Sequence, residues 1–243
     1  MRIFVVAAAA LSLAACETGS TGGLGSVLGD VVSGIGGQTS GGLTTAEIDA
    51  GLREALTIGT ERVSAQLGAT DGFFGDNRIR IPLPGRLGDL QDQLGKVGLS
   101  GPLDDLQLRM NRAAEASMPE ARKLVVSAVR SITLEDALGI LNGGNTAATD
   151  FLRDRTEASL INAFRPYIDT ALADSGAFQS LDSVTSRYGL SAVSNDLRGD
   201  MTDHAVGLGL EGLFYYVGEE ERRIRENPIA RTTDILRKVF GAA

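Results

Sequence analysis

AVGLGLEGLFYYV, at residues 205–217, is apolar on almost every face when it is drawn as a helix. A helix that is apolar all round is buried, but this one contains Glu211 and is too short to span a bilayer. We therefore predict that it forms the middle of a central buried helix over about 200–226. Its glycines are expected to let neighbouring helices approach closely, namely Gly207, Gly209 and Gly212.

Apolar residues recur at helical spacing in nearly every segment before this core. Thr44, with Glu47 three residues later, is a capping-box pattern that predicts the start of the first helix. Pro119 is expected to open a new helix, because proline suits the first turn. The predicted helices cover about 44–67, 85–96, 100–118, 119–132, 133–141, 146–174, 177–188, 200–226 and 232–240.

Residues 69–88 break the helical pattern. Residues 78–81 alternate like a short strand, and the prolines at 82 and 84 stop regular structure. Acidic residues here suggest calcium, but the EF-hand spacing and its closing glutamate are absent, so turn formation is the better interpretation. The sequence predicts an all-α fold: a single compact multi-helix domain over 44–243, around the central helix.

The start of the chain predicts where the protein is located. Arg2 precedes an apolar run over 3–13 that is too short to span a bilayer. Leu13-Ala14-Ala15-Cys16 then resembles a bacterial lipobox, in which the cysteine sulfur takes a diacylglycerol and the freed amine an acyl chain. We predict a lipoprotein signal peptide over 1–15 and lipidation of Cys16; an ordinary cleaved signal peptide is the alternative.

Residues 16–43 are rich in Gly, Ser and Thr and predict a flexible tether with a reach of roughly 30 Å. Glu17 follows the cysteine, and by analogy with enteric bacteria the absence of aspartate there favours the outer membrane. The expected location is the periplasmic side of the cell envelope, with the acyl chains on Cys16 holding the protein on the membrane.

The composition is acidic, with 23 Lys and Arg against 31 Asp and Glu and a formal net charge of −8. Phosphate backbones repel such a chain, so we expect no nucleic-acid partner. Anionic lipid headgroups repel it too, which favours attachment through acyl chains. Cys16 is the only cysteine, so no internal disulfide can form. No motif indicates a cofactor, and we expect none.

Several motifs occur in an order that is typical of one family. They are Ile81-Pro82-Leu83-Pro84, Met110-Asn111-Arg112-Ala113-Ala114-Glu115, Ile140-Leu141-Asn142-Gly143, the run from Glu219 to Pro228, and Val239-Phe240-Gly241. Over 44–241 the chain resembles the proteobacterial lipoproteins catalogued as domain of unknown function forty-one ninety-seven (DUF4197). The resemblance implies an all-helical envelope lipoprotein and implies no activity.

Candidate metal and catalytic residues are few. His204, the only histidine, could share a helix face with Asp200 and Glu211. A metal site needs three or four converging ligands, so a packing or capping role for His204 is the better interpretation, and we expect no metal. No nucleophile motif accompanies His204, which leaves a hydrolase as a third-ranked possibility.

Two charged clusters are the candidate binding residues. Arg112 and Glu115 lie three residues apart on one predicted helix, either as a buried pair that fixes helix register or as the polar floor of a ligand cleft. Arg222, Arg223 and Arg225 follow three glutamates at the end of the core helix. That end is either a solvated, self-paired surface or a docking surface for an envelope protein.

The sequence therefore favours a non-enzymatic protein-interaction component of the envelope. The alternative is a carrier or sensor of a small apolar or amphipathic ligand held between helices. That alternative predicts a pocket lined by Phe73, Phe74 or Tyr215, with Arg112 at its floor.

Overall fold

The computed structural model describes residues 44–190 and 194–241, and in them the chain forms eight α-helices and one short 3-10 helix. The helices are α2 (Thr45–Leu67), α3 (Gly85–Gly95), α4 (Gly101–Val129), α5 (Leu134–Leu141), α6 (Ala147–Asp174), α7 (Ala177–Arg187), α8 (Ser194–Glu226), η2 (Pro228–Ala230) and α9 (Asp234–Gly241). No strand occurs within the described ranges, which confirms the all-α prediction. The predicted signal peptide, Cys16 and the tether lie outside the described residues.

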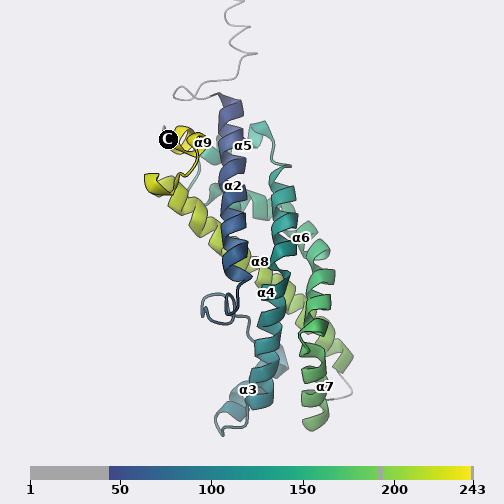
Figure 1. The fold of residues 1–243 in the computed structure, drawn as a ribbon. Coiled ribbons are helices and arrows are strands. Elements are labelled where there is room, and N and C mark those ends of the chain that lie inside the picture. Colours follow the sequence, from purple (N-terminus) through teal and green to yellow (C-terminus); the bar gives the residue numbers. More distant parts are fainter. Residues whose placement is uncertain (1–43, 191–193, 242–243) are drawn as a thin grey trace, which may run out of the picture.

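The helices form an elongated bundle in which α8 crosses behind α2, α4 and α6 (Figure 1). The start of α2 lies beside α9 at one end, and α3 and α7 lie at the other. α8 contacts α2, α4, α6, α7, η2 and α9, which confirms it as the central helix. Among the described helices none is long and apolar enough to cross a membrane.

One face of α8 lies at the surface, which the sequence pattern did not predict. Its inward side is fully buried, as at Leu213, Phe214 and Val217. On the opposite side Gly207 and Glu211 are exposed and Tyr215 keeps 41% of its surface accessible. The large apolar residues there are amphipathic or only half-buried, so the helix is apolar all round without being buried all round.

The start of α2 confirms the capping-box prediction. Thr44 accepts a hydrogen bond from the Glu47 backbone, and the Glu47 carboxylate accepts one from the Thr44 backbone. Gly51 lies against α9, where an added Cβ would come within 2.5 Å of a Val239 methyl carbon. The first and last helices therefore pack together tightly.

Residues 101–129 form one helix, so the predicted break at Pro119 is wrong. Proline inside a helix removes a backbone hydrogen bond and costs about 3 kcal/mol. Residues on both sides of it are fully buried, including Met118, Ala121 and Val125, and α4 packs against both α2 and α6. Burial of these apolar side chains outweighs the local penalty, because most helix stability in proteins comes from packing.

Of the three glycines of α8 that were predicted to allow close packing, Gly212 has the closest neighbours. These neighbours belong to a loop and not to another helix. An added Cβ at Gly212 would lie 3.0 Å from the Phe73 ring and 3.3 Å from Ile79 Cβ. At Gly209 the nearest atom is 3.8 Å away, and at Gly207 there is none within 4 Å. Residues 68–84, which connect α2 to α3, therefore pack directly on the central helix.

Candidate functional site

The connection over residues 68–84, here called the 68–84 loop, folds into a chain of tight turns. An added Cβ would come within 2.4 Å of the Leu67 carbonyl oxygen at Gly72 and within 2.6 Å of the Asp71 carbonyl oxygen at Gly75. Asp71 itself has a positive φ of 64°, a conformation that aspartate tolerates better than most residues. The strand-like pattern at 78–81 does not produce a strand.

Two buried polar side chains on α4 hold this loop. The Asn111 amide accepts a hydrogen bond from the Ile81 backbone nitrogen at 2.9 Å and donates one to the Ile81 carbonyl at 2.8 Å. The Glu115 carboxylate accepts from the backbone nitrogens of Phe73 and Phe74, at 3.1 and 3.2 Å. These bonds satisfy loop backbone groups that would otherwise be buried without partners.

Arg112 and Glu115 form the ion pair that the sequence suggested, with Glu115 buried and Arg112 half-buried. Arg112 donates to Glu115 at 2.7 Å and, through its other terminal nitrogen, to Asp71 at 2.7 Å. The hydrogen bond to Glu115, followed by the one to Asp71, raises the pKa of Arg112 above its ordinary value. Because Glu115 also binds the loop backbone, the pair fixes the loop on α4 and does more than set helix register.

A side chain of α8, Tyr216, holds the same loop from the other side. The Tyr216 hydroxyl donates to the Asp76 carboxylate, which also accepts two hydrogen bonds from the Arg78 guanidinium. Arg78 holds the pKa of Asp76 well below its ordinary value. Burial, reinforced by the bond to Asp76, raises the pKa of Tyr216 to about 12. The loop is therefore clamped between α4 and α8.

His204 also contacts the loop, since its Nε2 lies 3.0 Å from the Pro82 carbonyl oxygen. This contact agrees with the interpretation of His204 as a packing residue. No group of His, Cys, Asp or Glu side chains within the described ranges is arranged to hold a metal ion.

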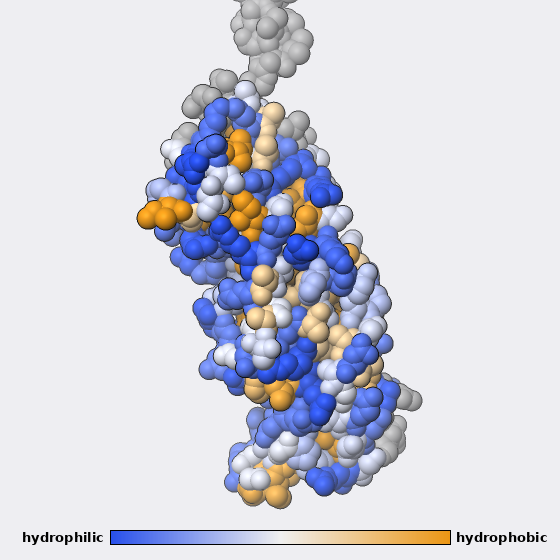
Figure 2. Space-filling view, in the orientation of Figure 1, coloured by the Kyte–Doolittle hydropathy of each residue, from blue (hydrophilic) through white to orange (hydrophobic). Residues whose placement is uncertain are grey.

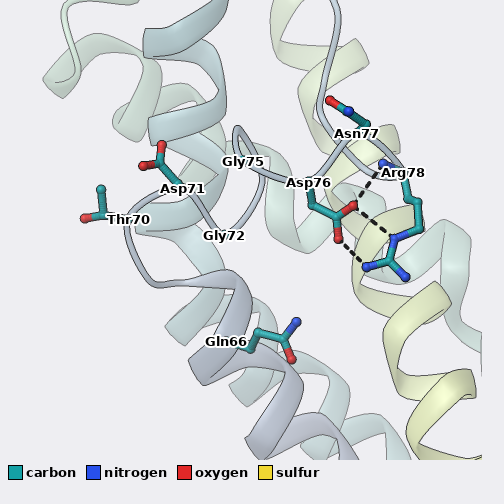
Figure 3. A pocket seen from close by; sticks show the side chains of 8 residues that line it. All are labelled: Gln66, Thr70, Asp71, Gly72, Gly75, Asp76, Asn77 and Arg78. Atoms are coloured by element: carbon teal, nitrogen blue, oxygen red, sulfur yellow. Dashed lines mark hydrogen bonds and ion pairs between the residues drawn. The ribbon is translucent and has the colours of Figure 1, made fainter.

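Figure 3 shows the hollow at the turns of the loop, which has a volume of about 630 Å³ and is lined by Gln66, residues 70–72 and residues 75–78. Asp76 points to Arg78, Asn77 points away from both, and Asp71 lies on the far side of the turn. The acidic side chains are already engaged by Arg112 and Arg78. This arrangement agrees with the turn-forming role predicted for them.

The ligand pocket that the sequence suggested does not form as predicted. Phe73 is fully buried, and Tyr215 and Arg112 line separate depressions. Arg112 lies in a shallow groove of about 690 Å³ between α4 and α6, with Ala116, Ala171 and Tyr167. Tyr215 borders a smaller cleft of about 260 Å³ between the 68–84 loop and α8. The residues of this cleft are Arg78, Ile79, Arg80, Pro82, Leu208, Glu211, Gly212 and Tyr215.

The three arginines at the end of α8 do not share one role. Arg222 and Arg223 are half-exposed, and each pairs with a glutamate three residues earlier. The Arg225 side chain is only 9% exposed and pairs with Glu221, which is 2% exposed. Arg225 also donates to the carbonyls of Ile140 and Leu141. The prediction of one arginine surface is therefore wrong for Arg225, which joins α8 to α5.

Glu221 is a structural residue that the sequence interpretation missed. Its carboxylate accepts from the backbone nitrogens of Ala148 and Thr149 at 3.1 and 2.8 Å, and so it caps the start of α6. A carboxylate at a helix N-terminus is favoured by the unpaired amides and the helix dipole. The sequence did contain a signal that Glu221 faces inward, because residue 221 lies on the same helix face as the apolar Val217 and Ile224.

The turn after α8 presents one isoleucine to solvent. Ile229 is 90% exposed, although the backbone around it is tightly held. The Asn227 side chain accepts from the Ile229 nitrogen at 3.0 Å, and Arg231 donates to the carbonyls of Ile224 and Arg225 at 3.0 and 2.7 Å. The neighbouring Ala230 is buried. Three hydrogen bonds thus hold the backbone of the turn that presents this exposed aliphatic side chain.

These features define a class of protein: an all-helical domain around one long helix, with a loop clamped between two helices by buried polar groups. The chain belongs to the family described as Protein of unknown function (DUF4197), whose model matches residues 42–241. The family resemblance read from the motifs is thereby confirmed. Neither a curated protein nor a solved structure gives a significant match.

Proposed function

We propose that this protein is a lipid-anchored component of the cell envelope that binds another envelope protein and catalyses no reaction. The anchor is argued from Leu13-Ala14-Ala15-Cys16, and Glu17 after it supports a location on the periplasmic side of the outer membrane. The binding surface, here called the Ile229 surface, consists of Arg222, Arg223, Asn227, Pro228 and Ile229.

The exposure of Ile229 on a hydrogen-bonded turn is the observation that carries this proposal. Because the backbone that presents this side chain is already held, little backbone entropy is lost when a partner covers it. Binding hot spots are aliphatic or aromatic anchors inserted into a pocket and surrounded by polar contacts. Arg222 and Arg223 supply such a polar rim, and their outward faces remain half-exposed while their glutamates neutralise them. The partner expected is a protein with an apolar pocket for Ile229 and a polar rim.

The test is photo-crosslinking in the native envelope from a probe residue placed at Glu226. Ile229→Ser should reduce the crosslinked partner at least tenfold, which corresponds to about 1.4 kcal/mol of lost binding. Val97→Ser is the matched control, because Val97 is also an exposed aliphatic residue, at 67%, in the turn between α3 and α4. It should leave the crosslink unchanged.

Charge reversal tests the rim separately. Arg222→Glu with Arg223→Glu should weaken the same crosslink while the melting temperature stays within a few degrees, because surface ion pairs contribute about 0–1 kcal/mol each. Arg225→Glu should unfold the protein instead, since it would bury two carboxylates together. Survival of the crosslink in both the Ile229→Ser and the double-arginine variants would contradict the proposal.

A second function, binding of a small amphipathic ligand, is favoured by the cleft beside Tyr215. That cleft combines an apolar lining with two arginines and a glutamate. It lies between the 68–84 loop and α8, in residues separate from the Ile229 surface, so the two functions can be tested independently.

A further inference from the structure

The cleft between the 68–84 loop and α8 contains one arginine that pairs with no carboxylate. Arg78 does pair with one, because its guanidinium donates two hydrogen bonds to Asp76. Arg80 is different: its Nε donates to the Phe74 carbonyl, and its guanidinium stacks on the Phe74 ring at 4.8 Å. No carboxylate in the described part of the chain pairs with it.

The two contacts with Phe74 fix Arg80 and leave the end of its guanidinium free. Nε is occupied, so the two terminal nitrogens form the remaining donor edge. A guanidinium held in this way matches the two oxygens of a carboxylate and loses little entropy when it binds one. Arg80 is therefore arranged to receive an anionic group at the edge of the cleft.

Glu211 borders the same cleft from α8 and is also exposed. Neither Arg80 nor any other cation among the described residues forms an ion pair with it. The cleft thus has one unpaired charge of each sign, and these two groups form no ion pair with each other. A ligand that carries both charges can satisfy both side chains at once.

Much of the remaining lining of the cleft is apolar. Leu208 and Ile79 are mostly covered, and Tyr215 forms one wall, with its ring set edge-on to Tyr216 at 5.1 Å. The whole cleft measures about 260 Å³, slightly less than the lower end of the usual range for drug-sized ligands. Its occupant is therefore small and has an apolar side chain.

We propose that this cleft binds a small zwitterion with an apolar side chain, such as an aliphatic α-amino acid. Its carboxylate binds Arg80, its ammonium group binds Glu211, and its side chain packs on Leu208 and Tyr215. Because the cleft is open to solvent, the Kd expected is on the order of 0.1–1 mM.

The test is titration calorimetry of the full chain in detergent with four matched probes. These are leucine, leucinamide, N-acetyl-leucine and N-acetyl-leucinamide, which carry both charges, the positive charge, the negative charge and neither. Leucine should bind at least tenfold more tightly than each of the other three. Equal binding of N-acetyl-leucinamide would mean that the cleft takes an internal polypeptide segment, and would overturn the proposal.

Two variants test which charged group of the ligand binds Arg80 and which binds Glu211. Arg80→Gln should abolish the difference between leucine and leucinamide, and Glu211→Gln should abolish the difference between leucine and N-acetyl-leucine. Glu211 makes no contact that holds the fold, so its variant remains informative if Arg80→Gln disturbs the loop. Arg187→Gln is the control, because Arg187 is an exposed arginine on α7, and it should bind like wild type. Absence of leucine binding at about 10 mM, or charge preferences that persist in both variants, would refute the site.

Discussion

At the scale of single residues, Tyr216 and Asp76 form a hydrogen bond that depends on pH. They are 140 residues apart in sequence, and the hydroxyl of one donates to the carboxylate of the other. The pKa of Tyr216 is raised to about 12 in the folded protein, first by burial and then by this bond. The protonated hydroxyl is therefore favoured by the folded state over the unfolded one, in which the pKa is about 10.

Because the pKa of Tyr216 is higher in the folded state, the stability that Tyr216 contributes should decrease at high pH. The contribution of Tyr216 to the free energy of unfolding should be complete below about pH 10 and decrease as the pH rises to about 12. Urea denaturation of wild type and Tyr216→Phe measures it: the stability difference between them should shrink from about pH 9 to about pH 11.5. Tyr215→Phe is the neighbouring control. A difference that stays constant over this range would contradict the assignment.

At the scale of elements, the contact between α8 and the 68–84 loop depends on the missing side chain at Gly212. Gly212→Val should lower the free energy of unfolding by about 2–3 kcal/mol relative to Gly207→Val. Both substitutions put the same β-branched residue into the same helix, so the propensity change cancels. The new side chain meets Phe73 and Ile79 at position 212 and no neighbour at 207. If the two variants had equal midpoints in chemical denaturation, the 68–84 loop would accommodate the new side chain with no loss of stability.

The sequence predicted the helices well where their ends carry local signals. Thr44 and Glu47 set the start of α2 through bonds between neighbours in sequence, which a pattern can show. Pro119 was misread because its local rule was overruled by packing against α2 and α6. Propensity is a weak prior wherever both flanks of a residue are buried.

The site could be predicted only in part, and the reason lies in long-range bonds. The Arg112–Glu115 pair was visible from spacing along one helix. The role of Glu115 at Phe73 was not, because nothing in the sequence brings residues 42 positions apart together. Arg225 was assigned to a surface because its neighbours are charged, although the face shared by Val217 and Ile224 showed that this side of the helix turns inward.

At the scale of the whole molecule, the amino-terminal sequence gives a prediction about the membrane. Lipidation of Cys16 should make the chain label with palmitate and remain in the membrane fraction, because two or three acyl chains hold a protein on a bilayer. Cys16→Ser should abolish the label and release the protein. Cell fractionation with palmitate labelling measures both effects. Retention of the variant on the membrane would show that another part of the chain provides the attachment.

The face of the domain seen in Figure 2 is mostly hydrophilic, with small separate apolar patches. Its ends differ in their distance from the predicted anchor, since α2 begins at the end where α9 lies and α3 lies at the opposite end (Figure 1). A tether at Thr44 would therefore leave α3 and α7 farthest from the membrane. The Ile229 turn, between α8 and α9, would lie nearer to it.

The contacts that hold the 68–84 loop on α4 and α8 also determine which parts of the fold can form first during synthesis. A ribosome makes α2 and the loop first, yet Tyr216 and the face of α8 that covers Phe73 are added 140 positions after Asp76. Until then the faces of α2 and of Phe73 that pack on α8 have no native cover, although α4 has already supplied Asn111 and Glu115 to the loop amides. Contacts this distant in sequence close slowly, after the loop-closure entropy has been overcome. A growing chain would thus carry exposed apolar surface for most of its synthesis, a stage at which a chaperone could bind it.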